Sequence, residues 1–183
     1  MLSEAEMATN PTSQVEEVLD RLEKEAVPPD SDSLAQIVKQ LAQLFRVAED
    51  EVAIMEVARS GRTLRFVVPE KLRQVGSIPL SSTSALAART ARERRSDIIN
   101  NFSVSRHASV FEGVHLGQRG AEAIQKIMSV PILRGNAVIG VAQICRKGVS
   151  TTDAGADFTS KDLSELNGLN QVLGRFLALC REN

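Results

Sequence analysis

Two apolar runs near the end of the sequence constrain the fold most strongly. IMSVPIL (residues 127–133) and AVIGVAQIC (residues 137–145) are rich in β-branched side chains and are separated by the three residues Arg-Gly-Asn. Two such runs joined by a short turn that contains glycine predict a β-hairpin. Because proline cannot donate to a strand ladder, Pro131 places the first strand at an edge of the sheet or at a bulge.

The segment after this hairpin predicts a long closing helix. A polar loop covers residues 149–157, Thr159 is placed to cap the helix, and Asp162 completes a capping-box pattern three residues later. At about 1.5 Å per residue the helix would be on the order of 33 Å long. Its apolar stripe consists of Leu163, Leu166, Leu169, Val172, Leu173, Phe176, Leu177 and Cys180.

The chain begins with two amphipathic patterns. After a polar start, apolar residues recur at helical spacing over residues 14–26, and Pro28 and Pro29 end that helix. Ser31 or Ser33 is placed to cap a second helix. The apolar stripe of this second helix is Leu34, Ile37, Val38, Leu41, Leu44 and Phe45.

The stretch between residues 51 and 99 predicts short elements. Ser60-Gly61 supplies the turn of a first hairpin, and Ser81, Ser82 or Thr83 is placed to cap a helix. The elements, in order, are strands at 51–58 and 64–68, an extended piece at 76–80, a helix at 84–94 and a short strand at 97–99. Antiparallel hairpins with helices packed against them make an α+β layer domain.

Residues 100–122 differ from their surroundings. They hold both histidines, three glycines and two phenylalanines, and they show no sustained period. Connections longer than about 12–15 residues are usually functional lids or disordered segments. The sequence therefore predicts a long loop here.

Composition excludes several classes of function. The net charge is -1 and the pI is about 6.2, so no overall field would attract nucleic acid, and the absence of Trp and Tyr removes the aromatic platforms on which bases stack. No apolar run approaches the roughly 20 residues of a membrane span. The first residues do not resemble a signal peptide. We therefore expect a cytoplasmic protein that binds neither nucleic acid nor membrane.

The ordered series of elements resembles a GAF domain, a small-molecule-sensing fold, over roughly residues 31–181. The resemblance is carried by Pro131 in the penultimate strand, by Ile139-Gly140-Val141 after the turn, and by Phe158-Thr159 with Asp162 at the last helix. It implies a central antiparallel sheet with helices packed on one face and a long lid loop over the other. It divides the chain into an N-terminal tail and amphipathic helix (residues 1–30) and a GAF-like domain (31–183).

Departures from the family pattern limit what the resemblance implies. Of the motif shared by members that bind cyclic nucleotides, only Lys147, Phe158 and Asp162 match. These residues suggest a Lys–Asp ion pair that ties the last strand to the last helix. No cysteine lies between residues 100 and 122, which excludes covalent bilin attachment there. Cys145 and Cys180 are expected to be too far apart for a disulfide, so a methionine sulfoxide reductase is not expected.

The resemblance also implies a ligand pocket between the sheet and residues 100–122. Gln143, a polar residue in an apolar strand, lies either on the floor of that pocket or on a solvent-exposed face. Two histidines on one loop are weak support for a metal site, and none is predicted. The arginines of 89–95 form either a solvated helix face or an anion contact. The expected ligand-facing residues are Phe102, Arg106, His107, Phe111, His115 and Gln143.

The function expected from these features is a non-catalytic sensor that signals in trans through a partner protein or a dimer. The ligand is an unidentified small molecule, and no cofactor is named. A homodimer through the N- and C-terminal helices is expected, because GAF proteins commonly associate in this way and the helix at 14–26 has an apolar stripe to bury. The alternative is a structural or dimerisation module whose pocket is filled by side chains.

Overall fold

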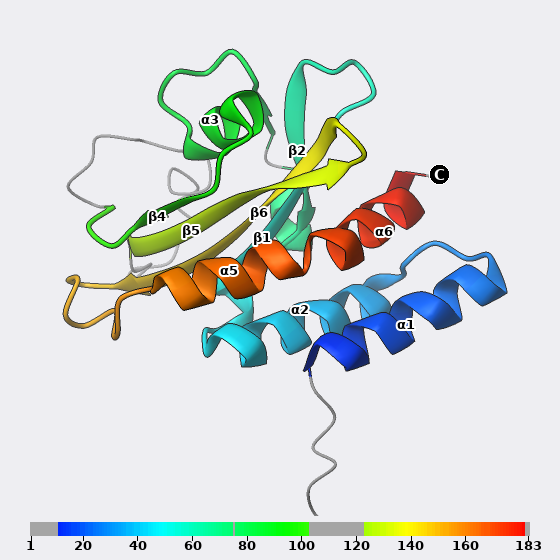
Figure 1. Ribbon diagram of the computed structural model, residues 1–183, viewed down its shortest axis with the longest axis horizontal. Coiled ribbons are helices and arrows are strands. Elements are labelled where there is room, and N and C mark those ends of the chain that lie inside the picture. The colour runs from blue at the N-terminus through cyan, green and yellow to red at the C-terminus, as the bar shows by residue number, and fades with distance from the viewer. Residues whose placement is uncertain (1–10, 75, 103–122, 182–183) are drawn as a thin grey trace, which may run out of the picture.

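A six-stranded antiparallel sheet forms the centre of the computed structural model, which describes residues 11–74, 76–102 and 123–181 (Figure 1). The strands lie side by side in the order β3-β2-β1-β6-β5-β4. Their bounds are β1 (Val52–Val57), β2 (Thr63–Val68), β3 (Ser77–Pro79), β4 (Asp97–Ile99), β5 (Ala123–Arg134) and β6 (Ala137–Gly148). The predicted hairpins and the α+β class are confirmed.

Helices cover both faces of this sheet (Figure 1). Four of them pack on one face: α1 (Pro11–Glu25), α2 (Ser31–Phe45), α5 (Ser160–Gly168) and α6 (Asn170–Arg181). Helix α3 (Leu86–Glu93) lies on the opposite face, where the alanines of residues 85–91 let it approach β5 and β6 closely. The sequence predicts only the loop on that face, and most of that loop lies outside the described residues.

Local capping chemistry sets where the helices begin. The side chain of Asp30, rather than Ser31 or Ser33, caps α2 by accepting a hydrogen bond from the Ser33 N–H at 2.8 Å. Helix α3 begins after Ala85 with no side-chain cap, so the cap predicted from Ser81, Ser82 or Thr83 is wrong. The Ser82 hydroxyl accepts from the Ala85 N–H at 3.1 Å, one residue before the helix. At α5 the predicted capping box is present, with Thr159 and Asp162 bonded to one another's backbone.

Helix α1 buries its apolar stripe inside its own chain. Val15, Leu19 and Leu22 are at most 3% exposed, and α1 packs against both α2 and α6. On the outer side, the Arg175 guanidinium of α6 bonds Asp20 at 2.5 Å and Glu23 at 2.8 Å. The bond from Arg175 lowers the pKa of the Glu23 carboxyl. The N-terminal helix is therefore part of the main core rather than a separate appendage.

The closing helix is broken, contrary to the single helix expected from its apolar stripe. Helix α5 ends at Gly168 and α6 begins at Asn170. The Asn170 side chain turns to the edge of β5, donating to the Pro131 carbonyl at 2.7 Å and accepting from the Leu133 N–H at 2.8 Å. The break thus coincides with the contact between Asn170 and β5, which the spacing of apolar residues cannot predict.

Pro131 lies where the sheet edge is open. Strand β4 pairs with β5 only as far as Ser129, so the next residues of β5 have no strand partner on that side. Proline leaves no N–H to be satisfied there, and Asn170 satisfies the remaining carbonyl and N–H groups. The predicted edge position of Pro131 is confirmed.

Replacing Asn170 by Ala is expected to destabilise the fold by about 2 kcal/mol, because two backbone groups of a partly buried edge lose their partner. Urea unfolding followed by circular dichroism measures the change. The neighbouring exposed residue Gln171 supplies the matched control, and Gln171→Ala is expected to change stability by no more than about 0.5 kcal/mol. Equal effects of the two substitutions would show that the Asn170 contact contributes nothing.

Candidate ligand-binding face of the sheet

The face of the sheet beneath α3 contains the candidate site. Side chains two residues apart on a strand point to the same face. Val141 packs in one apolar cluster with α3 and β1, whereas Cys145 packs in a second cluster with Leu86 and Phe102. Gln143 lies between them on β6. The site is therefore a polar position between two buried apolar clusters.

Three polar side chains meet at this position. Gln143 is 3% exposed, Ser129 0% and Thr90 1%. The Gln143 amide donates to the Ser129 hydroxyl at 3.2 Å, and that hydroxyl lies 2.7 Å from the Thr90 hydroxyl. Strand pairing accounts for the arrangement, because Gln143 is directly opposite Ser129 on β5, while Thr90 descends from α3. We call Thr90, Ser129 and Gln143 the polar triad.

The burial of the polar triad decides one of the two alternatives predicted for Gln143. Its burial shows that the solvent-exposed alternative is wrong, while contact with a ligand stays a prediction. Thr90 and Ser129 are not among the predicted residues. Ser129 interrupts the apolar run IMSVPIL as Gln143 interrupts the following strand, and this shared signal could have found it. Nothing in the sequence around Thr90 indicates that it reaches the sheet.

Phe102 is the other predicted ligand-facing residue that the structure describes. It is 1% exposed and packs with Leu86, Ile127 and Cys145. Its side chain makes core contacts on the sheet face, and contact with a ligand stays a prediction. The predicted residues Arg106, His107, Phe111 and His115 lie outside the described residues.

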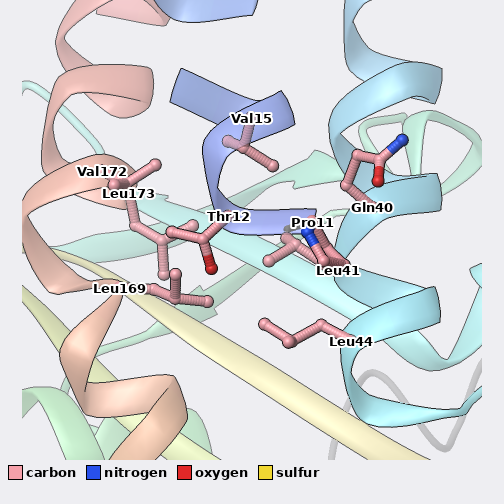
Figure 2. Close-up of a pocket in the computed structure, with 9 residues that line it drawn as sticks. All are labelled: Pro11, Thr12, Val15, Gln40, Leu41, Leu44, Leu169, Val172 and Leu173. Carbon is pink, nitrogen blue, oxygen red and sulfur yellow. The ribbon is translucent and has the colours of Figure 1, made fainter. Parts of the chain in front are cut away.

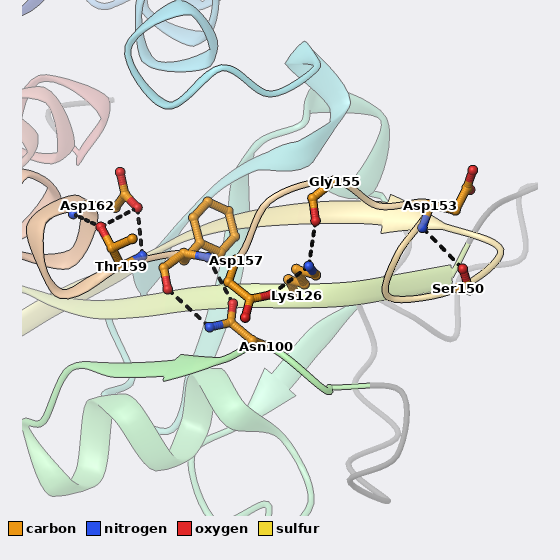
Figure 3. Close-up of polar contacts among 9 residues, drawn as sticks. Asn100, Lys126, Ser150, Asp153, Gly155, Asp157, Thr159 and Asp162 are labelled. Carbon is orange, nitrogen blue, oxygen red and sulfur yellow. Dashed lines mark hydrogen bonds and ion pairs between the residues drawn. The ribbon is translucent and has the colours of Figure 1, made fainter.

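The chain on either side of residues 103–122 is held by paired hydrogen bonds (Figure 3). The Asn100 side chain accepts from the Phe158 N–H at 2.9 Å and donates to the Phe158 carbonyl at 3.0 Å. The Phe102 N–H donates to the Gln125 carbonyl at 2.9 Å. These bonds hold residues 100–102 against the loop before α5 and against β5.

Lys126 anchors the loop between β6 and α5 from beneath (Figure 3). It is 4% exposed, and its ammonium donates to the Gly155 carbonyl at 2.5 Å and to Asp157 at 2.6 Å. A buried ammonium is stable only when it is paired and hydrogen-bonded. Lys126 therefore has a structural role on the face opposite the polar triad.

The prediction that Lys147 pairs with Asp162 is wrong. The Lys147 ammonium binds the Asp50 carboxylate at 2.9 Å. Burial alone would raise the pKa of the Asp50 carboxyl, but the hydrogen bond and charge of Lys147 outweigh it, so that this pKa is lowered. Asp162 instead accepts from the Thr159 N–H at 2.7 Å. The partial match to the cyclic-nucleotide motif thus corresponds to two separate structural contacts.

The arginines of residues 89–95, in α3 and just after it, are largely engaged in structural contacts. Arg89 pairs with Asp97 of β4 at 3.0 Å. Arg92 donates to the carbonyls of Leu80 and Ser82, each at 2.6 Å. Arg95 contacts Glu93 and Asp97. These bonds favour the structural interpretation of the cluster over an anion site.

The two cysteines lie on opposite faces of the sheet and form no disulfide with one another, as predicted. Cys145 is fully buried beside Phe102, and Cys180 packs against the cluster on the side of the four helices. Burial, with a smaller contribution from the Glu56 carboxylate, raises the pKa of the Cys180 thiol to about 12. Reactive cysteines have lowered pKa values, so Cys180 has the opposite character.

Cys180 is expected to react with iodoacetamide at pH 8 on the order of 10³-fold more slowly than glutathione, because only its thiolate reacts. Peptide mapping of timed samples measures the rate. Labelling in urea is the control, since unfolding removes the burial and should restore an ordinary rate. A native rate close to that of glutathione would contradict the expectation.

A hollow lies on the other side of the sheet, between α1, α2 and the junction of α5 and α6 (Figure 2). It is an almost entirely apolar crevice, too narrow to admit a water molecule. Thr12 and Gln40 are its polar residues. A binding site normally adds several convergent polar groups to an apolar wall, so this crevice is a weaker candidate than the face with the polar triad. Its other walls are Pro11, Val15, Leu41, Leu44, Leu169, Val172 and Leu173.

The described residues contain neither a cluster of metal-ligating side chains nor a membrane-spanning helix. No group of three or more His, Cys, Asp or Glu side chains that could hold a metal ion occurs among them. No helix within the same residues is long and apolar enough to cross a membrane.

The fold and this face define a class of α+β domain in which a sheet carries a helix layer on one side and a partly polar floor on the other. The family model for the GAF domain matches residues 31–179. The chain belongs to the GAF domain family, which consists mostly of regulatory domains. No curated protein sequence matches it.

Solved structures share the fold at low sequence identity. The GAF domain of the Acinetobacter phosphoenolpyruvate-protein phosphotransferase is 19% identical, with 94% of this chain and 95% of that chain covered and a TM-score of 0.62. The GAF domain of a two-component sensor histidine kinase from Bacillus halodurans is 16% identical, with 84% and 95% covered and a TM-score of 0.54. Free methionine-R-sulfoxide reductase from Neisseria meningitidis, in complex with its substrate, is 17% identical, with 96% and 95% covered and a TM-score of 0.55.

Proposed function

We propose that this chain is a non-catalytic sensor domain that binds a small molecule on the sheet face beneath α3. The polar triad carries the proposal, since a buried amide and two hydroxyls between apolar clusters provide the few polar groups that orient a ligand in an apolar site. Cytoplasmic location is part of the proposal.

The absence of catalysis is supported by the thiols. The fold also occurs in an enzyme, the methionine sulfoxide reductase, so the fold alone does not decide the matter. Here one cysteine is enclosed in the sheet and the other has a raised pKa on the far side. Thiol chemistry requires an exposed thiol with a lowered pKa, whereas Cys145 is buried and the pKa of Cys180 is raised.

Output in trans through a partner protein or a homodimer completes the proposal. The apolar stripe of α1, on which the expected dimer rests, is satisfied within the chain, so a dimer through the N- and C-terminal helices would use the outer surfaces of α1 and α6. Arg175 joins these two helices and would keep them together in such a contact.

Native mass spectrometry of the protein purified from its own host tests the proposal. A small molecule released at near-stoichiometric amount on denaturation is the expected result, and the intact mass reports the oligomeric state in the same experiment. A clean dimer with no released molecule would favour the alternative, a structural or dimerisation module.

One observation favours that alternative. The Phe102 side chain is fully buried against the sheet, as it would be if side chains filled the pocket. Phe102→Ala distinguishes the two functions. If the chain is a structural module, the variant loses stability and binds no small molecule. If it is a sensor, the variant still releases a small molecule on denaturation, either the same one or a bulkier one.

A further inference from the structure

The strand residues that form the floor beneath α3 and Phe102 are uncharged. Strand β1 contributes alanine and methionine, β5 isoleucine and serine, and β6 valine, glutamine and cysteine. At the rim, Arg89 and Asp97 neutralise one another at 3.0 Å. An ionised group placed on this floor would therefore lose water without meeting an opposite charge among the described residues, which is costly. The floor residues are Ala53, Met55, Ile127, Ser129, Val141, Gln143 and Cys145.

Gln143 has hydrogen-bonding capacity left over. A glutamine amide carries two N–H donors and a carbonyl acceptor. Among the described residues, its side chain makes one hydrogen bond, from an amide N–H to the Ser129 hydroxyl at 3.2 Å. The second N–H and the carbonyl oxygen have no partner there, although Gln143 is only 3% exposed. A ligand that pairs with both atoms would therefore use hydrogen-bonding groups that the described residues leave unused.

The neighbours of the Gln143 amide within the sheet are small, and one of them holds it by a hydrogen bond. The residues paired with Gln143 on the two neighbouring strands are small, Ala53 on β1 and Ser129 on β5. Ser129 is itself fixed by Thr90 at 2.7 Å. Thr90 and Ser129 are therefore positioning residues, and Gln143 is the residue that would contact the ligand.

We propose that Gln143 recognises a carboxamide-type group, a primary amide or a lactam edge, on an uncharged ligand. Such a group presents one donor and one acceptor side by side, which matches the two unused atoms of the Gln143 amide. A carboxylate presents acceptors only and would bring a negative charge to a floor whose described residues include no cation. This inference rests on the proposed sensor function and adds the chemistry of the ligand to it.

Matched pairs of fragments test the ligand class. Saturation-transfer NMR titrations would use benzamide with benzoate, nicotinamide with nicotinate, and cyclohexanecarboxamide with cyclohexanecarboxylate. At least one carboxamide is expected to bind the full chain about tenfold more tightly than its acid. Gln143→Met, which keeps the length of the side chain and removes its donor and acceptor, is expected to abolish this preference.

Controls separate recognition from folding. Gln40→Met makes the same change on α2, across the sheet, and should leave the preference intact. Cooperative thermal unfolding of Gln143→Met would show that the variant is folded. If it does not fold, Ser129→Ala is the second variant, which frees the amide from its anchor and should reduce the preference several-fold.

The outcomes also separate this inference from the proposed function. Equal binding of amides and acids, or a preference that survives Gln143→Met, would overturn the amide assignment and leave the sensor standing. A released ligand without an amide or lactam group would do the same, and one that contains such a group would support the assignment. Absence of both fragment binding and released ligand would overturn both proposals.

Discussion

Gly140→Ala is expected to destabilise the protein by about 3 kcal/mol, because a methyl group at this position has nowhere to go. A Cβ built on Gly140 would lie well inside 3.0 Å of both the Leu177 side chain and the Met55 carbonyl oxygen. The leucine could rotate away, but the carbonyl belongs to the β1–β6 ladder and cannot move without breaking strand pairing. The added Cβ would therefore clash with both the Leu177 side chain and the backbone of β1.

Urea unfolding of Gly140→Ala beside Gly168→Ala measures this effect. Gly168 lies at the end of α5, and a Cβ there would have no neighbour within 4 Å. Alanine at that position is expected to leave stability unchanged or to raise it by up to about 1 kcal/mol through helix propensity. For Gly140→Ala, a loss below about 1 kcal/mol, well short of the usual cost of overpacking, would mean that β1 and α6 separate more easily than their packing indicates.

The elements that sequence could predict are those governed by local rules. Both hairpins follow from alternating or β-branched runs around glycine turns, and the Thr159–Asp162 capping box needs only two side chains three residues apart. The end of α5 follows a different rule. The apolar stripe continues through Leu169, so periodicity predicts one helix, whereas the break depends on a bond from Asn170 to a strand far away in sequence.

The candidate site shows the same division. Gln143 can be noticed because a polar residue interrupts an apolar strand, and the same test would have found Ser129. Thr90 cannot be predicted from the sequence in this way, because its contact with Ser129 depends on how α3 crosses the sheet. The sequence motif pairs Lys147 with Asp162, but the actual partner is Asp50, 97 residues earlier. Only the pairing of β1 with β6 brings Asp50 close to Lys147.

Removal of α1 is expected to have a larger effect than any single substitution. The family model begins at residue 31, which suggests that a folded domain could start there. However, Val15, Leu19 and Leu22 are buried against the rest of the chain. At about 1.5–3 kcal/mol for each side chain, their burial contributes roughly 5–9 kcal/mol, comparable with the total stability of about 5–15 kcal/mol typical of a domain.

A chain that begins at Val27 should therefore unfold without a cooperative transition or aggregate when heated, because the faces of α2 and α6 that α1 covers become exposed. Leu19→Ala gives a graded version in the full chain, with an expected loss of about 2–5 kcal/mol, and Glu17→Ala on the exposed side of α1 supplies the control. Differential scanning calorimetry compares these three variants with the full-length protein. If the truncated chain melts cooperatively near the full-length temperature, α1 is an accessory to a domain that folds without it, and its outer surface becomes the stronger candidate for contact with a partner.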